Sequence, residues 1–536
     1  MPRFLPALSP RHWPLLVLLA VLCTAQAAGH DGRRLLQMLV LLLPGWLWLG
    51  WPLASRGGRT LQAVLAGLLG LAFLLDGIVR AFLLDQYQAQ PGSAMVLGAV
   101  ANTSPGETAE FVAMYWRAVL GWSLAGVLGA GTLAACLWQW WRKPPRRLPL
   151  RWKQAVALGL ILAVVLAAYA SKPWRRHHPL LFWPGWLQQV AQLQQQWATL
   201  DGERQALLLQ AERLQPELTA AAPDTLVLVI TDSVNRDHFG LYGYPRATTP
   251  QLQAVQQRAR PALQVFRHAW SVDASTVPAL RNLFQFGTPD QPDAPHLLAL
   301  ARAAGYRVWW IGNHADLAIE QEHARLAQQV RMVNQSPGRS GGQPDGVVLP
   351  ELAAALADPA HRKLVVIHLL GAHPHYRLRY PAGDNPFSGA ADAVMASMQA
   401  AGRPGWLRGL RNDYDAAIHY HDRVLAGTLE HVLQARGKRV WLYLSDHGQE
   451  VGQESNHAGH SPMTASGYRI PLLLWQSHPG TQPAATGEPV RADWLGYSIT
   501  ALLGLAWSGA RPERDVLSPG YHWQAPTLPV TVDFHR

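Results

Sequence analysis

Long apolar runs dominate the first third of the chain, whereas the rest alternates shorter apolar runs with polar segments. A run of about 20 apolar residues matches the hydrocarbon thickness of a bilayer. The predicted membrane-spanning helices lie at residues 13–28, 36–54, 60–84, 117–140 and 153–171. The first run is short and its flank CTAQAAGH resembles a signal-peptidase site, but the four spans that follow favour a retained helix.

From Asp224 onward, short apolar runs alternate with helical stretches rich in Ala, Leu and Arg. The predicted buried strands lie at residues 225–231, 307–313, 364–370, 439–445 and 470–475. Strands that alternate with helices indicate a mostly parallel sheet covered on both faces, with ligands at the carboxyl ends of the strands. The predicted fold class is therefore an N-terminal all-α transmembrane bundle followed by a C-terminal α/β domain.

The segment that joins these two parts contains Phe182, Trp183 and Trp186. Aromatic residues grouped in this way are typical of a membrane interface. The Gln-rich stretch that follows fits an amphipathic helix and a plain linker equally well. The predicted organisation is a five-helix transmembrane domain (1–171), an interfacial linker (172–223) and an exported α/β domain (224–536).

Basic residues indicate the orientation in the membrane. The loop between the fourth and fifth predicted spans carries Arg142, Lys143, Arg146, Arg147, Arg151 and Lys153. Short loops this basic stay in the cytoplasm. With five spans, residues 85–116 and everything after the last span are then exported. Arg33 and Arg34, in another exported loop, fit this orientation less well but are outnumbered.

The formal net charge of +11 does not indicate a nucleic-acid-binding protein. Much of the excess lies in that cytoplasmic loop and in SKPWRRHHP after the last span, which includes Arg175 and Arg176. Basic residues beside a bilayer more often contact anionic lipid head groups. The two cysteines, Cys23 and Cys136, fall in predicted spans, so the exported domain must be held by a hydrophobic core without a disulfide.

Side chains that can bind metal follow three of the predicted strands. Asp232 follows the first strand, and Asp446 and His447 follow the fourth. His373 and His375 follow the third. Carboxylates and imidazoles that converge from separate strands are typical ligands of zinc and similar divalent ions. The pattern predicts a metal site at one edge of the sheet, with one position open to substrate.

Five segments, in the same order along the chain, resemble the membrane phosphoethanolamine transferases of the alkaline phosphatase and sulfatase superfamily. They are VITDSVNRDHFGLYGYPRATTPQL, LLGAHPHYRLRYP, NDYDAAIHYHDRVLAGTLEHVL, YLSDHGQEVG and RIPLLLW. The resemblance covers residues 224–510 and extends to the N-terminal spans and to LGAVANTSPGETAEFV in the exported loop. It is closest to the lipopolysaccharide-core type, because lipid A-type relatives carry several disulfides and the exported domain of this chain has no cysteine.

The resemblance implies a multi-pass enzyme of the bacterial inner membrane with its catalytic domain in the periplasm. The implied donor is phosphatidylethanolamine, and the implied acceptor is a lipopolysaccharide core sugar, lipid A or another periplasmic glycan. One zinc ion is implied, with a second ion left open. The implied partners include membrane lipids and exclude nucleic acid.

Carried over position by position, the resemblance makes Asp232, Thr276, Asp446 and His447 the expected metal ligands. Relatives usually have Glu where this chain has Asp232, which is one methylene shorter. Thr276 is the expected nucleophile, through a covalent phospho-enzyme intermediate, and Ser275 is the alternative. Both lie where WSVDASTVPAL predicts the N-terminus of a helix, which would stabilise a phosphorylated side chain.

His373 resembles the family's histidine that protonates or orients the leaving group, and His375 competes with it for this role. On the substrate side the resemblance points to His457, with His460 as its competitor. The remaining substrate-side candidates lie in the exported loop and are Asn102, Glu107 and Glu110. A structural role, such as capping and solvating a short helix, fits these three residues almost as well.

Other functions stay open at this point. A glycerophosphate transferase, or another phosphotransferase or hydrolase of the superfamily, would share the same metal-binding loop. A sulfatase would also need a Cys/Ser-x-Pro-x-Arg motif, and none follows the first metal-binding strand. A catalytically inactive scaffold is disfavoured by the intact pair of Asp446 and His447.

Overall fold

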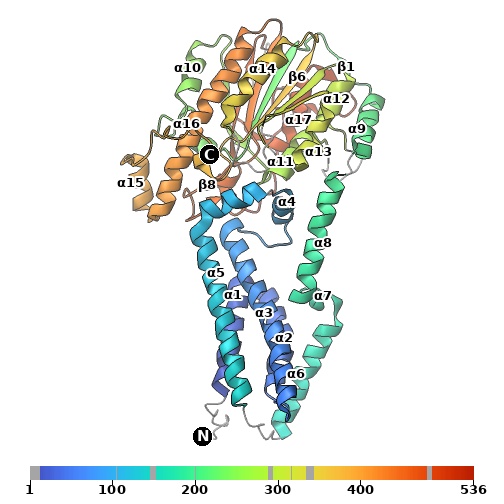
Figure 1. Cartoon of the computed structure of the whole chain (residues 1–536). Coiled ribbons are helices and arrows are strands. Elements are labelled where there is room, and N and C mark those ends of the chain that lie inside the picture. Colours follow the sequence, from blue (N-terminus) through green and yellow to red (C-terminus); the bar gives the residue numbers. More distant parts are fainter. Residues whose placement is uncertain are drawn as a thin grey trace. The chain divides into compact units, whose positions relative to one another are not determined.

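The computed structural model describes residues 12–103, 105–144, 152–198, 201–287, 294–314, 317–333, 343–479 and 486–536. The chain forms two compact units (Figure 1). The helical unit comprises Met1–Leu97 and Tyr115–Gln192, and the sheet unit comprises Gly98–Met114 and Leu193–Arg536.

The helical unit contains the segments predicted to span a membrane. Its helices are α1 (Trp13–Gly29), α2 (Gly32–Leu49), α3 (Arg56–Tyr87), α6 (Trp152–Ala170), α7 (Lys172–Arg175) and the larger parts of α5 (Pro105–Arg142) and α8 (Pro179–Ala198). Within the described residues, α3 and the Gly106–Arg142 part of α5 are long and apolar enough to cross a membrane. Trp13–Gly29 and Val156–Ala170 are shorter apolar helices. A helical N-terminal region is thus confirmed, and the number of five spans stays a prediction.

A buried ionic cluster ties α3 to its neighbours. Asp76 of α3 accepts hydrogen bonds from Arg80 Nε at 2.8 Å and from the indole of Trp183 at 3.0 Å. His30 Nε2 lies 3.0 Å from the other carboxylate oxygen of Asp76. The indole of Trp183, predicted to lie at a membrane interface, is therefore held by a buried carboxylate of the same unit.

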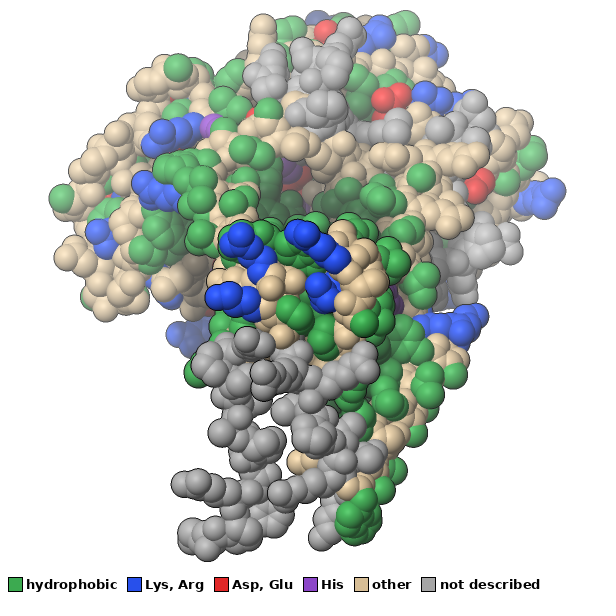
Figure 2. Space-filling model, turned by 60° about the horizontal axis from the view of Figure 1, so that its bottom comes forward, with side chains coloured by type: hydrophobic (Ala, Val, Ile, Leu, Met, Phe, Trp, Pro, Cys, Tyr) green, Lys and Arg blue, Asp and Glu red, His purple; other side chains and the backbone are tan. Residues whose placement is uncertain are grey.

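Basic side chains stand at the start of α3 and at the end of α5. They are Arg56, Arg59, Arg142 and Lys143. The face of the molecule in Figure 2 shows more Lys and Arg than Asp and Glu side chains, in agreement with the net charge of +11. Residues 145–151, which complete the predicted cytoplasmic loop, lie outside the described residues. Cys23 and Cys136 are free thiols of this unit.

The sheet unit is built on an eight-stranded sheet in the order β11-β3-β10-β7-β2-β6-β4-β5 (Figure 1). The strands are β2 (Thr225–Thr231), β3 (Gln264–Trp270), β4 (Arg307–Gly312), β5 (Gln329–Met332), β6 (Lys363–Leu369), β7 (Arg439–Ser445), β10 (Arg469–Gln476) and β11 (Pro489–Arg491). All pairs are parallel except those of β10, which runs antiparallel to β3 and β7. The predicted mostly parallel sheet is confirmed, and it contains all five predicted strands.

Helices cover both faces of this sheet (Figure 1). The helices of this unit are α9 (Asp201–Arg213), α10 (Pro250–Arg258), α11 (Thr276–Phe284), α12 (Leu297–Ala303), α13 (Leu317–Glu322), α14 (Val348–Ala357), α15 (Ala393–Ala400), α16 (Gly405–Gln434) and α17 (Leu495–Leu502). Of these, α15 lies beside α16 and away from the sheet (Figure 1). Leu226, Leu228 and Ile230 of β2 belong to a core shared with α11, α12 and α17, and Val227 and Val229 to a core shared with α10, α14 and α16. Every residue of β2 is buried, as expected of a central strand covered on both sides.

The segment Gly98–Met114, called the loop segment below, groups with the sheet unit. It contains the end of α4 (Ala94–Asn102) and the start of α5. The backbone of α5 leaves helical geometry at Tyr115 (φ −103°, ψ 21°), where the chain passes into the helical unit. The predicted substrate-side residues Asn102, Glu107 and Glu110 are therefore part of the sheet unit.

Replacing a central core residue should destabilise the sheet unit strongly. Leu228 is fully buried in β2, so Leu228→Ala removes packing and leaves a cavity, at a cost of about 2–5 kcal/mol. The expected result is a clear fall in the thermal unfolding temperature of the full-length protein in detergent. Leu209→Ala, on α9 and 44% exposed, is the control and should change that temperature little. Equal falls for both variants would contradict the packing described here.

Candidate metal centre

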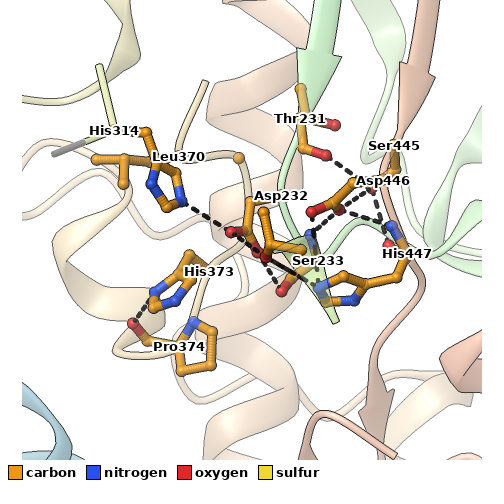
Figure 3. A network of polar contacts seen from close by, with 12 residues as sticks. Thr231, Asp232, Ser233, His314, Leu370, His373, Pro374, Ser445, Asp446 and His447 are labelled. Carbon is orange, nitrogen blue, oxygen red and sulfur yellow. Dashed lines mark hydrogen bonds and ion pairs between the residues drawn. The ribbon is translucent and has the colours of Figure 1, made fainter. Parts of the chain in front are cut away.

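Two carboxylates emerge at the same edge of the sheet because their strands are neighbours. β2 and β7 pair in parallel with Thr231 opposite Ser445, so the next residues, Asp232 and Asp446, lie side by side (Figure 3). β6 runs parallel on the other side of β2. Its continuation turns at Gly371 (φ +56°), where a Cβ atom would stand 2.6 Å from the carbonyl oxygen of Asp232.

His447 adds an imidazole in the orientation that metal binding requires. Its Nε2 lies 3.7 Å from Asp446 Oδ2 and 3.9 Å from Asp232 Oδ1. Its Nδ1 lies 2.7 Å from the carbonyl oxygen of Gly448 and must donate, since a carbonyl only accepts. In the neutral imidazole, the form that binds metal, the lone pair is then on Nε2, beside the carboxylates. A Cβ atom at Gly448 would stand 2.2 Å from the Ser466 carbonyl oxygen, so this turn requires glycine.

Asp446 has one oxygen without a partner. Its Oδ1 accepts the backbone N–H groups of Ser233 at 3.1 Å and His447 at 2.6 Å. Its Oδ2 is buried and has no hydrogen-bond partner in the part of the chain that the structure describes. Burial raises the pKa of the Asp446 carboxyl to about 7, against the opposing charge of His447 and with the added repulsion of Asp232. A cation beside Oδ2 would supply the missing partner, so this donor set fits a divalent metal ion.

Asp232 accepts hydrogen bonds from three side chains. Ser233 Oγ donates to Oδ1 at 2.5 Å, while Thr276 Oγ1 and His314 Nε2 donate to Oδ2 at 3.1 and 2.8 Å. Burial alone would raise the pKa of the Asp232 carboxyl. The neighbouring histidines, first His373 and then His314, nevertheless hold that pKa well below its usual range. The Asp232 carboxyl is therefore ionised, as a carboxylate ligand of a metal must be.

The hydroxyl of Thr276 lies at the centre. Besides its bond to Asp232, its Oγ1 lies 3.4 Å from His447 Nε2. Thr276 is the first residue of α11, and Ser275 is the N-cap, extended (φ −156°) and without a side-chain capping hydrogen bond. Among the described hydrogen bonds, none joins the Ser275 side chain to Asp232 or His447. The structure thus brings Thr276, and not Ser275, to the carboxylates.

His314 also lies in the centre, although it was not among the residues predicted from the sequence. It is 1% exposed, follows β4 and donates to Asp232 (Figure 3). Its ring stacks on that of His368 at 4.7 Å between centroids. The signal was the same as at the other strand ends, because the strand predicted at 307–313 runs directly into this imidazole.

His460 joins the centre, and His457 supports it. The ligand atoms of Asp232, His447 and His460 all lie within 4.8 Å of one another, a spacing at which one ion can be shared. His460 Nε2 also lies 3.3 Å from Ser233 Oγ. His457 Nε2 donates to the backbone carbonyl of His460 at 3.1 Å. The residue named as a competitor of His457 is thus the one that reaches the metal-ligand atoms.

His373 borders the centre, whereas His375 contacts the loop segment. The ring centroid of His373 is 5.8 Å from that of His314. Its Nδ1 donates to the carbonyl oxygen of Pro374 at 3.2 Å (Figure 3). His375 has a left-handed backbone (φ +67°), and its N–H points to Met114 Sδ at 2.9 Å.

The three predicted substrate-side residues of the loop segment have different surroundings. Asn102 Oδ1 accepts the backbone N–H of Ala318 at 3.3 Å. Glu107 lies in the first turn of α5 and is partly exposed. Glu110 is buried and forms an ion pair with Arg379 at 2.8 Å.

Comparison with known proteins gives the class that this fold and site define. Residues 224–505 match the profile of the Sulfatase family, so the chain is a sulfatase-family protein. Phosphoethanolamine transferase EptC of Escherichia coli (strain K12) is 30% identical over 465 residues, which cover 81% of this chain and 78% of EptC. Within the sulfatase family, the chain therefore belongs to the phosphoethanolamine transferases. The resemblance found in the sequence motifs is confirmed.

The solved structures that are similar to this chain include two phosphoethanolamine transferases. The C-terminal periplasmic domain of EptC from Escherichia coli, in complex with Zn, has a TM-score of 0.53 and 31% identity and covers 56% of this chain and 88% of its own. The integral membrane protein lipooligosaccharide phosphoethanolamine transferase A (EptA) from Neisseria meningitidis has a TM-score of 0.58 and covers 94% of this chain and 96% of its own. At 19% identity, EptA shows the shared fold of a helical N-terminal region and an α/β domain.

Zinc should stabilise the metal-free full-length protein. A ligand that binds only the folded state adds about 2.7 kcal/mol of stability at a concentration 100 times its Kd. We expect added Zn²⁺ to raise the unfolding temperature, and Asp446→Asn to remove most of that rise because it removes an anionic oxygen. Asp422→Asn is the matched control, since Asp422 is buried but accepts the backbone N–H groups of Gln251 and Leu252. An equal zinc response in both variants would remove Asp446 from the metal site.

Proposed function

We propose that this protein is a zinc-dependent phosphoethanolamine transferase of the bacterial inner membrane. It moves phosphoethanolamine from phosphatidylethanolamine to a lipopolysaccharide acceptor, either a core sugar or lipid A. One observation carries the proposal: the Thr276 hydroxyl contacts Asp232 at 3.1 Å and lies 3.4 Å from Nε2 of His447. A nucleophile, two carboxylates and an imidazole in one buried place suit phosphoryl transfer through a covalent intermediate.

The metal ligands in this proposal are Asp232, Asp446, His447 and the hydroxyl of Thr276. The partnerless Oδ2 of Asp446 and the Nε2 lone pair of His447 support the first ion. When bound, zinc supplies Lewis-acid chemistry that lowers the pKa of a coordinated hydroxyl. His460, whose ligand atom lies within 4.8 Å of those of Asp232 and His447, is a further candidate ligand for this ion.

In the first half-reaction, Thr276 Oγ1 forms a bond to the phosphorus of phosphatidylethanolamine. The Asp232 carboxylate accepts the hydrogen bond that orients the hydroxyl. The hydroxyl proton passes to solvent as the new bond forms, and the bond between phosphorus and the diacylglycerol oxygen breaks. His373 gives a proton to the departing alkoxide, so diacylglycerol leaves neutral. The phosphoethanolamine group then stands on Thr276 at the start of α11, where backbone N–H groups favour an anion.

In the second half-reaction, a hydroxyl or phosphate of the acceptor attacks the same phosphorus. Its proton passes to a base such as His373, and Thr276 leaves and regains its proton. The two halves use the same groups in reverse, which a ping-pong transferase requires. The substrate-side residues kept from the family pattern are His457, His460, Asn102 and Glu107. Glu110 was predicted with them, but its carboxylate is paired with Arg379.

The membrane arrangement belongs to the same proposal. Five spans put the α/β domain (224–536) in the periplasm, where both lipid donor and lipopolysaccharide acceptor are found. The region 172–223 connects the two parts along the membrane surface, and Arg175 and Arg176 attract phosphate-bearing lipids. A site that acts on lipid head groups needs this kind of anchoring, because its donor does not leave the bilayer.

Removing the Thr276 hydroxyl should abolish transfer. With labelled phosphatidylethanolamine, Thr276→Ala should lower transfer to lipopolysaccharide by at least about 1,000-fold, as expected when a nucleophile is lost. Ser275→Ala, the adjacent hydroxyl, is the control and should retain most of the activity. Near-normal transfer by Thr276→Ala would move the role to Ser275.

The donor and acceptor can be identified in the same cells. Mass spectrometry of lipopolysaccharide, with and without the gene, should show a difference of one phosphoethanolamine, mapped to core or lipid A. Labelled phosphatidylglycerol supplied in parallel should transfer nothing. Transfer of a glycerophosphate group instead would replace the proposed donor.

A further inference from the structure

A buried ion pair joins the loop segment to the loop that carries His373. Arg379 Nη2 donates to Glu110 Oε2 at 2.8 Å, and the two side chains are 1% and 6% exposed. Glu110 lies in α5, and Arg379 follows the short 3₁₀ helix Tyr376–Leu378. The two residues are 269 positions apart in the chain, yet both belong to the sheet unit.

The same guanidinium also holds the backbone of the His373 loop. Arg379 Nε donates to the carbonyl oxygen of His373 at 3.2 Å, and Nη2 donates to that of Pro374 at 3.3 Å. A planar guanidinium can serve a carboxylate and two carbonyls together because its donors are fixed in a fork. Arg379 is therefore a clamp with Glu110 on one side and two consecutive carbonyls on the other.

A second contact from α5 reaches the same loop. The N–H of His375 points to Met114 Sδ, and Met114 is four residues after Glu110, on the same face of the helix. His375 is also one of the few non-glycine residues with positive φ in the described chain (+67°). The loop therefore adopts an unusual conformation where α5 packs against it.

The position of the His373 ring depends on this backbone. Its Nδ1 donates to the carbonyl oxygen of Pro374 (Figure 3), the same oxygen that accepts from Arg379, so the orientation of the ring follows that of the Pro374 peptide. The ring centroid lies 5.8 Å from that of His314 and 6.2 Å from that of His460. Displacing Pro374 would turn this imidazole relative to the metal centre.

We propose that Glu110 is a positioning residue that acts through Arg379 to hold His373 at the metal centre, and that it is not a ligand of the donor's ammonium group. The carboxylate of Glu110 already has a buried cation as its partner, so attraction of a second cation would have to compete with Arg379. The role of His373 in proton transfer rests on the proposed function. The coupling of Glu110 to the loop that carries His373 rests on the contacts alone.

The test uses the full-length protein in detergent with Glu110→Gln, Arg379→Gln and the double variant. Each single variant should speed hydrogen–deuterium exchange of peptides spanning residues 370–380. Each should lower kcat for transfer from phosphatidylethanolamine by about 100-fold, the cost of a misplaced catalytic group. KM should stay within about threefold, because no substrate contact is lost.

The double variant separates a shared role from two independent ones. Acting through one clamp, the two substitutions should together cost no more than about threefold beyond the worse single variant. Arg379→Lys keeps a charge opposite Glu110 but lacks the fork, so it should fold normally and still loosen the loop. Arg377→Gln is the matched control: Arg377 is two residues away, pairs with Asp413 and is 73% exposed. It should change neither exchange nor kcat.

Two results would overturn the inference. A Glu110→Gln variant with unchanged loop exchange and kcat, but KM raised more than tenfold, would make Glu110 a binding residue for the head group. Multiplying effects in the double variant would separate Glu110 from Arg379. Absence of any transfer by the wild type would defeat the proposed function alone, because the exchange experiment still reports whether Glu110 holds the loop.

Discussion

The proximity of two buried carboxylates, Asp232 and Asp446, is the constraint on which the sheet unit depends. Their parallel strands are hydrogen-bonded neighbours in register, so the sheet itself forces the two acids together away from water. Like charges in such a place are costly unless they are neutralised. Imidazoles and hydroxyls surround Asp232, whereas backbone N–H groups donate to only one oxygen of Asp446. A divalent cation bound between the two acids would neutralise them, and the proposed chemistry depends on such an ion.

The fold was largely predictable because the central strands of this sheet are buried on both faces. Such strands appear as uninterrupted apolar runs, and TLVLVIT and RVWLYLS became β2 and β7 with the predicted bounds. The strands of this eight-stranded sheet that were not predicted are β3, β5 and β11. β3 (QVFRHAW) interrupts its apolar residues with Arg and His, while β5 and β11 have only four and three residues. The antiparallel direction of β10 could not be predicted, because its apolar sequence resembles that of the parallel strands.

The site residues were predictable where an Asp or His directly follows a predicted strand. Residues elsewhere in the chain were harder to identify. Asp232, Asp446 and His447 were found by that rule, and the same rule, applied to β4, would have found His314. Between His457 and His460 the sequence offered no distinction, since only the turn that carries them decides which imidazole reaches the carboxylates. Their chemical roles in the reaction are still predictions.

The loop segment shows a different limit. Its Glu110 was recognisable as a candidate, but its partner lies 269 residues away, and a sequence carries no sign of such an ion pair. The prediction that Glu110 contacts substrate and the inference that it holds a loop therefore start from the same residue. The fold decides between these two roles, because it pairs the Glu110 carboxylate with Arg379.

The two cysteines of the sequence both lie in the helical unit, and Cys136 is buried. The sheet unit therefore contains no native thiol that would compete with an engineered cysteine for a label. A single engineered thiol beside the His373 loop could carry a fluorophore or spin label there, with competing attachment confined to Cys23. The label would then report how substrate addition changes the surroundings of the His373 loop in the full-length protein.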